Sequence, residues 1–203
     1  MPSTPIAAVV LAAGMSRRLG RPKALVSVNG LTLVEWSYRR LCERGCRVVV
    51  VVNGDIAEQV ATLLPEAQLV VNDDPDAGRM RSLQLGCSAL AQRTGVLPER
   101  LLMAPVDRPC WNVEILDVLL RASTSTAPAH QDRRGHPVVL DTSDIAKVMA
   151  ADSMASLRDL ISFAPVPVAA PWLHLNIDTE SDVNQLLENE PGLLACFSQG
   201  EGI

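Results

Sequence analysis

Four short aliphatic runs constrain the fold of this chain more than any other feature of its sequence. They are residues 6–12 (IAAVVLA), 47–52 (RVVVVV), 68–71 (QLVV) and 100–106 (RLLMAPV). Runs that are apolar at successive positions are typical of strands whose two faces are both covered by helices. Amphipathic segments separate the runs and predict helices near 31–44, 55–63, 79–93 and 111–122. Repeated strand–helix–strand units predict a three-layer α/β fold, in which a mostly parallel, twisted, Rossmann-like sheet carries helices on both faces.

The second half of the chain is less regular. Strand-like patterns occur at 137–140, 166–169 and 173–177, and helices are expected near 142–150 and 154–162. A last helix is expected to begin at Thr179, because the segment TESD places Asp182 three residues later, as in a capping box. The chain has 203 residues and no internal repeat or low-complexity linker. We therefore expect a single domain over 1–188 and a packed or frayed C-terminal tail over 189–203.

Composition excludes several classes of protein. The formal net charge is -5, so the basic footprint of a nucleic-acid-binding protein is missing, and we expect no nucleic-acid partner. No apolar stretch approaches the roughly 18 residues needed to span a bilayer, and the first aliphatic run is interpreted as a strand, not as a signal peptide. The five cysteines are scattered and never spaced C-x-x-C, which favours free thiols in a reducing compartment. We expect a cytoplasmic protein, and the sequence leaves its oligomeric state open.

A cluster of cations follows the first aliphatic run and contrasts with the acidic average of the chain. The segment LAAGMSRRLGRPK, residues 11–23, contains two glycines and four cations: Arg17, Arg18, Arg21 and Lys23. If 6–12 is a strand, this segment lies at its carboxyl end, where open α/β sheets bind ligands. Gly14 and Gly20 would let backbone N–H groups approach an anion closely. We predict that the loop binds the triphosphate of a nucleotide; the alternative is a turn with solvated arginines.

The same segment resembles the L-A-A-G-x-S-x-R-x-G-x-x-K signature of the MobA-like nucleotidyltransferases, a family that includes molybdenum cofactor cytidylyltransferases. The resemblance implies a fold of the nucleotide-diphospho-sugar transferase type. It also implies nucleotide-binding roles for the matching residues, which are Leu11, Ala12, Ala13, Gly14, Ser16, Arg18, Gly20 and Lys23. The pair Ala12–Ala13 favours CTP, because family members that use GTP tend to carry L-A-G-G instead.

Two aspartates each follow a predicted strand, Asp107 in LLMAPVDRP and Asp178 in LHLNIDTESD. A triphosphate normally binds with Mg²⁺, which prefers carboxylate and water oxygens. On the residues alone, Asp107 could equally be a turn residue, and Asp178 a carboxylate favoured beside a helix N-terminus. The resemblance implies that both are metal ligands, because DRP matches the family's D-x-P and DTESD matches its D-T-x-x-D. Asp182 is then interpreted as the cap partner of Thr179.

Two further segments match family motifs. DAGRMRSLQLG, residues 76–86, resembles G-x-x-x-S-L-x-x-G, which implies that Gly78 and Ser82 contact the nucleotide at a helix N-terminus. The alternative for Ser82 is a helix start that faces the core. RRGHPVVL, residues 133–140, matches G-H-P and implies that Gly135 and His136 lie on the acceptor side, although a lone histidine is more often a surface or core residue. The family's G-D-x-G-A-R is not reproduced at 151–160, which leaves the acceptor open.

These features predict a nucleotidyltransferase that moves an NMP, with CMP favoured, from an NTP to a small phosphorylated acceptor and releases pyrophosphate. Arg18, Lys23 and Asp107 are the predicted catalytic residues. Mg²⁺ is the predicted cofactor, and molybdopterin is the acceptor that the resemblance favours. Two alternatives stay open: a sugar- or alcohol-phosphate nucleotidyltransferase of the same fold, and a non-catalytic nucleotide-binding protein or cofactor chaperone.

Overall fold

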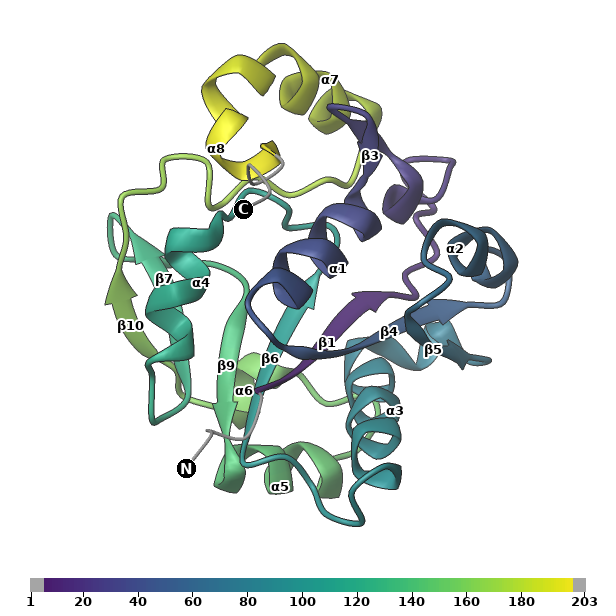
Figure 1. Cartoon of the computed structure of the whole chain (residues 1–203), viewed down its shortest axis with the longest axis vertical. Coiled ribbons are helices and arrows are strands. Elements are labelled where there is room, and N and C mark those ends of the chain that lie inside the picture. Colours follow the sequence, from purple (N-terminus) through teal and green to yellow (C-terminus); the bar gives the residue numbers. More distant parts are fainter. Residues whose placement is uncertain (1–5, 199–203) are drawn as a thin grey trace.

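One mixed eight-stranded sheet runs through the protein in the order β10-β7-β9-β6-β1-β4-β5, with the short β8 paired to β7 (Figure 1). The computed structural model describes residues 6–198, so the predictions that concern residues 1–5 and 199–203 lie outside the described residues. The strands are β1 (Ala7–Ala12), β2 (Ser27–Val28), β3 (Leu31–Thr32), β4 (Arg47–Asn53), β5 (Gln68–Asn72), β6 (Arg100–Pro105), β7 (Thr126–His130), β8 (Arg133–Arg134), β9 (Val138–Asp141) and β10 (Ala164–Pro167).

Helices cover both faces of this sheet. The α-helices are α1 (Leu33–Glu43), α2 (Ala57–Leu63), α3 (Gly78–Gln92), α4 (Val113–Leu120), α5 (Thr142–Ala150), α6 (Leu157–Leu160), α7 (Glu180–Glu188) and α8 (Leu194–Phe197). Three short 3-10 helices are η1 (Lys23–Leu25), η2 (Pro75–Ala77) and η3 (Glu190–Leu193). Helices α1, α2 and α4 pack on one face and α3 and α5 on the other, in two separate apolar clusters.

The strand β1 shows why the sequence is aliphatic at successive positions. Ala8 and Val10 point into the cluster with α1, α2 and α4, whereas Val9 and Leu11 point into the cluster with α3 and α5. Because successive side chains of a strand point to opposite faces, both sets must be apolar when both faces are covered. The strands β5, β4, β1 and β6 are parallel to their neighbours, and β9 runs antiparallel beside β6. The predicted α/β fold with a mostly parallel sheet is therefore confirmed.

Part of the predicted tail packs against the body of the protein. Phe197 of α8 is fully buried, and its ring lies 5.8 Å from the ring of Trp36 in α1 in an edge-to-face arrangement. Leu193 of η3 is also buried in the same cluster. Within residues 190–198, Leu193 and Phe197 thus pack in one cluster with Trp36 of α1.

Two predicted elements differ from the structure, and one strand of the main sheet, β7, was not predicted. Residues 173–177 were expected to form a strand, but they form turns and an extended segment, because Leu173 and Ile177 are buried individually against the core without a neighbouring strand. The helix expected over 154–162 is reduced to the short α6. Strand β7 was not expected, since its sequence TAPAH contains small residues and a proline where aliphatic residues usually signal a buried strand.

The sheet order places the carboxyl ends of β1 and β6 side by side. The chain continues from β1 towards β4 and β5 on one side, while β6 lies on the other side of β1. Ligands of open α/β sheets bind at such a reversal of strand order, outside the carboxyl ends.

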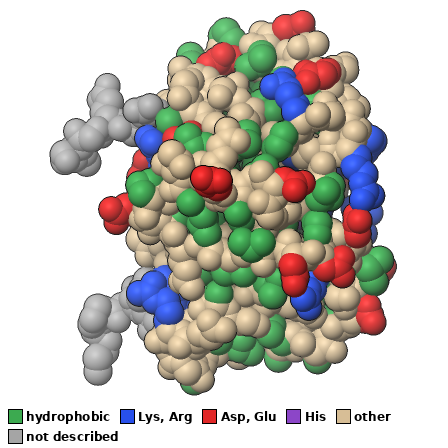
Figure 2. All heavy atoms as spheres, turned by 90° about the vertical axis from the view of Figure 1, so that its right-hand side faces the viewer, with side chains coloured by type: hydrophobic (Ala, Val, Ile, Leu, Met, Phe, Trp, Pro, Cys, Tyr) green, Lys and Arg blue, Asp and Glu red, His purple; other side chains and the backbone are tan. Residues whose placement is uncertain are grey.

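On the face shown in Figure 2, acidic and basic side chains are interspersed with other side chains. Among the described residues, no helix is both long and apolar enough to cross a bilayer.

Candidate active site

The loop after β1 is folded by Ser16. Its hydroxyl accepts a hydrogen bond from the Lys23 backbone N–H at 3.0 Å, and its carbonyl oxygen accepts from Leu19 and Gly20, both at 3.0 Å. Ser16 and Gly20 have positive φ angles of 52° and 74°, and Gly20 adopts this conformation without strain. The predicted nucleotide-binding residue Ser16 therefore has a structural role: it closes the loop so that Lys23 turns back towards the sheet.

The neighbouring strand β4 anchors the start of this loop. Asn53 is buried and donates its side-chain amide to the Ala13 carbonyl oxygen at 3.2 Å. Ala12 and Ala13 are almost completely buried, while Gly14 lines the adjoining cavity. The small residues of the L-A-A-G segment thus bring the backbone at Gly14 close to the cavity without a side chain in the way.

Of the four cations in the loop, two point towards the sheet and two do not. Arg17 pairs with Asp76 at 2.8 Å and Arg21 pairs with Glu180 at 2.7 Å, all with largely exposed side chains. Arg18 and Lys23 both reach Asp178, at 2.8 Å and 2.6 Å. The predicted pair Arg18 and Lys23 therefore lies beside Asp178, whereas Arg21 fastens the rim of the loop. Arg17 pairs with Asp76 but lines the same cavity as Gly14.

The two predicted metal ligands lie around one lysine. The Lys23 Nζ atom is 2.6 Å from Asp178 Oδ1 and 3.8 Å from Asp107 Oδ2. Asp107 lies two residues after the end of β6, and its backbone carbonyl accepts a hydrogen bond from Ile177 N at 2.9 Å. This bond brings the extended segment before Asp178 alongside the end of β6. The two aspartates thus meet although the predicted strand before Asp178 is absent.

A helix cap fixes the backbone at Asp178. Thr179 and Asp182 form the predicted capping box at the start of α7, with both reciprocal bonds present. The same Asp182 carboxylate accepts a hydrogen bond from Asp178 N at 2.9 Å. Burial alone would raise the pKa of Asp178, but the hydrogen bond from Lys23 and the charges of Lys23 and Arg18 outweigh it and lower this pKa. Asp178 is therefore ionised at neutral pH.

The donor set fits a divalent cation that shares its ligands with a substrate. Asp107 Oδ1 is buried and has no hydrogen-bond partner, so one carboxylate oxygen is free to bind a cation. Across residues 6–198, no three His, Cys, Asp or Glu side chains are grouped as a complete metal site. Mg²⁺ usually keeps several waters and binds through one or two carboxylates plus substrate phosphates, which matches a site with two aspartates.

Two cavities meet at this point. The smaller one, about 290 Å³, is lined by the loop after β1 together with Asp107 and Asp178. The larger one, about 940 Å³, lies on the side of α6 and β8. Leu11 and Arg79 line both cavities. A nucleotide in the smaller cavity and an acceptor in the larger one would therefore face each other across these two residues.

Arg79 is a site residue that the sequence analysis missed. Its guanidinium lies 2.7 Å from Asp107 Oδ2, at the first turn of α3. A signal was present, because Arg79 directly follows Gly78 in the matched segment DAGRMRSLQLG and therefore begins the helix. Arg108, in DRP, also lines the larger cavity and donates to the His174 carbonyl at 2.9 Å.

Gly78 and Ser82 lie beside the site but line neither of the two cavities. Gly78 has φ 89° and ψ -179°, a conformation restricted almost entirely to glycine, so it makes the turn into α3. Ser82 is buried, and its hydroxyl accepts a hydrogen bond from Asn72 at 2.9 Å. The structure gives both residues a structural role, and their contact with a nucleotide stays a prediction.

Gly135 and His136 both line the larger cavity. A Cβ atom on Gly135 would lie 2.4 Å from Leu173 Cγ, so only glycine fits between β8 and the segment that carries Leu173. His136 keeps part of its surface open to the cavity, and its Nδ1 atom is buried without a hydrogen-bond partner. Burial, followed by the charges of Arg79, Arg108 and Arg158, lowers the pKa of His136 to about 3. His136 is therefore neutral at physiological pH.

The chain is similar to proteins of several named activities. Nicotine blue oxidoreductase of Paenarthrobacter nicotinovorans is 33% identical over 166 residues, which cover 74% of this chain and 79% of that one. The 2-C-methyl-D-erythritol 4-phosphate cytidylyltransferase of Bifidobacterium longum is 44% identical over 161 residues, covering 75% of this chain and 55% of that enzyme. The molybdenum cofactor guanylyltransferase of Rhizobium johnstonii is 26% identical over 196 residues, covering 88% and 90%.

Solved structures share the fold. The protein Rv0371c from Mycobacterium tuberculosis superposes with a TM-score of 0.75 and 22% identity, over 93% of this chain and all of that one. A complex of the same protein with manganese superposes with a TM-score of 0.72 at 21% identity, covering 91% of this chain and 99% of that one. The model of the MobA-like NTP transferase domain matches residues 8–168, which confirms the resemblance seen in the sequence. This chain belongs to the MobA-like NTP transferase domain family.

Proposed function

We propose that this nucleotidyltransferase moves CMP from CTP to a phosphorylated acceptor and releases pyrophosphate. The observation that carries the proposal is the position of Lys23 between Asp107 and Asp178. All three residues line the smaller cavity, together with the loop after β1. A cation and two carboxylates beside a glycine-containing anion loop are what a metal-chelated triphosphate requires.

The residues around the smaller cavity would have different roles in the reaction. Backbone N–H groups near Gly14 would bind the triphosphate, while Arg18 and Lys23 would turn from Asp178 to the β- and γ-phosphates. An acceptor phosphate oxygen attacks the α-phosphorus, a new P–O bond forms, and the bond to pyrophosphate breaks. Lys23 and Arg18 would stabilise the negative charge on the leaving pyrophosphate. Such a reaction needs positioning and charge stabilisation and no covalent nucleophile from the protein.

Asp107 and Asp178 are the residues that would hold Mg²⁺. A bound Mg²⁺ would neutralise charge that develops at the α-phosphate. The unpartnered Asp107 Oδ1 supports this assignment, and so does the manganese complex of the structurally similar Rv0371c. Arg79, which now pairs with Asp107, would be released towards the boundary of the two cavities when the carboxylate binds a cation.

The choice of CTP and of the acceptor rests on sequence likeness. The Ala12–Ala13 pair supports CTP, and so does the 44% identity to a cytidylyltransferase. GTP is the competing nucleotide, because a molybdenum cofactor guanylyltransferase aligns along 88% of this chain. That relative also supports a phosphorylated pterin such as molybdopterin as the acceptor.

A second candidate function is oxidation–reduction with a dinucleotide, favoured by the 33% identity to nicotine blue oxidoreductase. A pyrophosphate-containing dinucleotide could use the same anion loop. Hydride transfer, however, needs no pair of carboxylates beside the phosphates. The ionised Asp178 and the unpartnered Asp107 oxygen therefore favour nucleotidyl transfer.

Thermal unfolding with each of the four NTPs, with and without Mg²⁺, tests the proposal, because a ligand that binds only the folded state raises its melting temperature. NADPH is included for the second candidate. We expect the largest shift with CTP, dependent on Mg²⁺ and lost in Asp107→Asn, but retained in Asp117→Asn, whose carboxylate pairs with Arg44 and lines neither cavity. No Mg²⁺-dependent shift with any NTP, or a shift with NADPH alone, contradicts the proposal.

A further inference from the structure

The side chains that line the larger cavity carry more positive than negative charge. Five arginines line it, against two aspartates, in a chain whose net charge is -5. The arginines are Arg79, Arg108, Arg133, Arg134 and Arg158. They come from four separate places: the start of α3, the end of β6, the strand β8 and the helix α6. Their convergence is thus a property of the fold and not of one basic segment.

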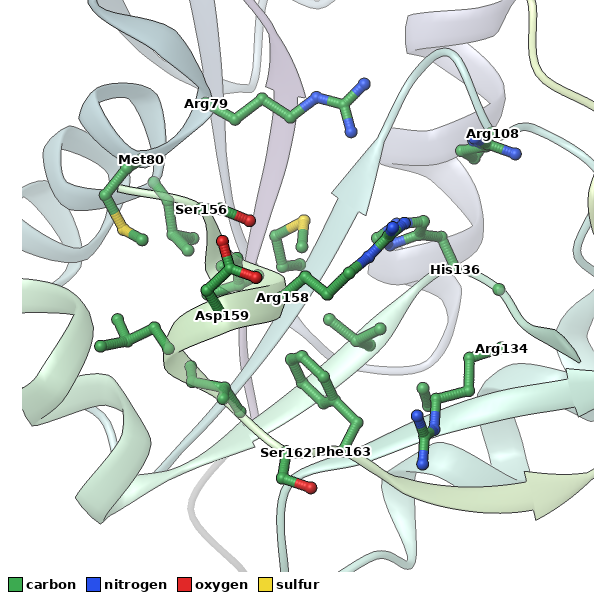
Figure 3. A pocket seen from close by; sticks show the side chains of 18 of the residues that line it. Arg79, Met80, Arg108, Arg134, His136, Ser156, Arg158, Asp159, Ser162 and Phe163 are labelled. Carbon is green, nitrogen blue, oxygen red and sulfur yellow. The ribbon is translucent and has the colours of Figure 1, made fainter. Parts of the chain in front are cut away.

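Four of these five arginines have no carboxylate partner within 4 Å among the described residues. Arg79 pairs with Asp107, and Arg108 donates to a backbone carbonyl. In the part of the chain that the structure describes, no side-chain ion pair involves Arg133, Arg134 or Arg158. Figure 3 shows the Arg158 side chain reaching across the cavity towards His136, with Arg134 on a neighbouring wall. The guanidinium groups therefore face a space that an anion could fill.

Two buried atoms point to the same conclusion. His136 Nδ1 and Arg108 Nε are both buried and have no hydrogen-bond partner. Buried polar atoms normally find a partner in the protein, in water or in a ligand, because leaving them unpaired costs about 1–3 kcal/mol. Both belong to residues that line the cavity, so a polar ligand there would satisfy them.

Part of the cavity wall is apolar. Met80 and Leu83 of α3, Met103 of β6 and Phe163 before β10 contribute side chains to it. A volume of about 940 Å³ is in the range that holds a ligand of drug size, and it is far more than a phosphate or a short polyol phosphate fills. The ligand should therefore have a substantial apolar body as well as negative charge.

We propose that the acceptor carries a second anionic group, apart from the phosphate that is nucleotidylated, on an apolar body, and that Arg134 and Arg158 bind this second group. The inference rests on the proposed function for the identity of the first phosphate. That phosphate lies at the boundary with the nucleotide cavity, beside Arg79, and the second anion lies further inside the larger cavity, where Arg134 and Arg158 line it. The apolar body spans the space between them along Met80, Met103 and Phe163. A small, highly polar acceptor with a single phosphate would leave both the apolar wall and two arginines unused.

The test compares two probes, 2-naphthyl phosphate and the same compound with a sulfonate on the ring remote from the phosphate. Their affinities are measured by isothermal titration calorimetry at fixed ionic strength. The proteins are the wild type, the double variant Arg134→Gln/Arg158→Gln and Arg121→Gln. Arg121 is exposed at the end of α4 and lines neither cavity, so Arg121→Gln controls for the removal of one positive charge elsewhere on the surface.

We expect the sulfonated probe to bind the wild type about tenfold more tightly or better, which corresponds to one charge-assisted hydrogen bond. The double variant should lose most of this preference, and Arg121→Gln should keep it. Equal affinities of the two probes for the wild type, or a preference that survives in the double variant, overturn the inference. Binding of CTP with Mg²⁺ is measured in the same variants. If the wild type binds CTP normally but shows no preference between the probes, only this inference is contradicted. If the wild type shows the preference but does not bind CTP, the proposed function is contradicted.

Discussion

Lys23 and Asp178 are joined by an ion pair of 2.6 Å although 155 positions separate them in the chain. Their contact is possible because the loop after β1 folds back at Ser16, and because the segment before Asp178 is bonded to the end of β6. Lys23 also lies 3.8 Å from Asp107, so its ammonium group shares with Arg18 and Arg79 the compensation of two carboxylates. A bound cation would take over this compensation and leave the lysine available to a phosphate.

The first prediction concerns Lys23. Lys23→Ala should weaken CTP binding about tenfold or more, the effect of losing one charge-assisted hydrogen bond. Turnover should fall about 100-fold, as when one electrostatic donor to a transition state is removed. The measurements are CTP affinity with Mg²⁺ and pyrophosphate release with molybdopterin as the acceptor. The CTP measurement holds even if the acceptor is another compound.

Arg21→Ala is the matched control for Lys23. Arg21 lies two residues earlier in the same loop, but its guanidinium pairs with the exposed Glu180. Exposed pairs contribute little, so both readouts should stay within about threefold of the wild type. Equal effects of the two substitutions would remove Lys23 from the proposed mechanism.

The second prediction separates packing from binding at two glycines. Gly135→Ala places a methyl group 2.4 Å from Leu173 Cγ and should destabilise the fold by about 1–3 kcal/mol. Adding Leu173→Ala should relieve the clash, so that the double variant is more stable than the sum of the two single effects. Urea unfolding of the four proteins measures this coupling. Additive effects within about 0.5 kcal/mol would show that the two sites are independent.

Gly14→Ala, in contrast to Gly135→Ala, should affect binding and not packing. No atom lies within 4 Å of a Cβ built on Gly14, and this glycine lines the nucleotide cavity. The free energy of unfolding should therefore change little, while the affinity for CTP should fall. A stable variant with unchanged CTP affinity would exclude close approach of the triphosphate to Gly14.

The sequence predicted the sheet and both aspartates because these depend on local patterns. Aliphatic runs mark strands that are covered on both faces, and a residue directly after such a run lies at the carboxyl edge. Asp107 was found in this way. Asp178 was found through the resemblance and through the Thr179 cap, although the expected strand before it is absent. The alternating Leu173, Leu175 and Ile177 resemble a strand only because each contacts the core separately.

The sequence could not predict which side chains from distant elements lie close together. The motifs around Arg134 and Arg158 indicated only that both segments lie on the acceptor side. That the two side chains line one cavity depends on how the fold brings β8 and α6 together. Ser82 belongs to a motif that predicts contact with a nucleotide, and this contact stays a prediction. What the motif could not show is that the Ser82 hydroxyl accepts a buried hydrogen bond from Asn72. Arg79 was overlooked because its partner, Asp107, lies on another strand.

The third prediction is a pH dependence of stability caused by His136. Its pKa is about 3 in the folded protein, compared with an ordinary value of 6.5. Between these values the unfolded chain binds a proton that the folded protein does not, so the free energy of unfolding rises as pH increases from about 3 to 6.5 and is level above that. His136→Gln should show a shallower rise between pH 5 and pH 7 in urea unfolding. The same slope in both proteins would mean that His136 has an ordinary pKa when folded.

The fourth prediction concerns Arg40, a cation that is 3% exposed and stacked 4.1 Å from the centre of the Trp111 ring. It donates to the backbone carbonyls of Trp36, Pro109 and Trp111, and Pro109 lies two residues after Asp107. Burial lowers the pKa of Arg40 to about 10, so it stays charged at neutral pH. Arg40→Met should destabilise the fold by about 3 kcal/mol, because buried carbonyls lose their donor. It should also reduce the Mg²⁺-dependent rise in melting temperature with CTP, because the loop that carries Asp107 loses its anchor. Arg44→Met, at the exposed end of the same helix, should change stability by less than about 1 kcal/mol. If Arg40→Met is as stable as Arg44→Met in urea, or is destabilised with a full CTP shift, Arg40 does not position Asp107.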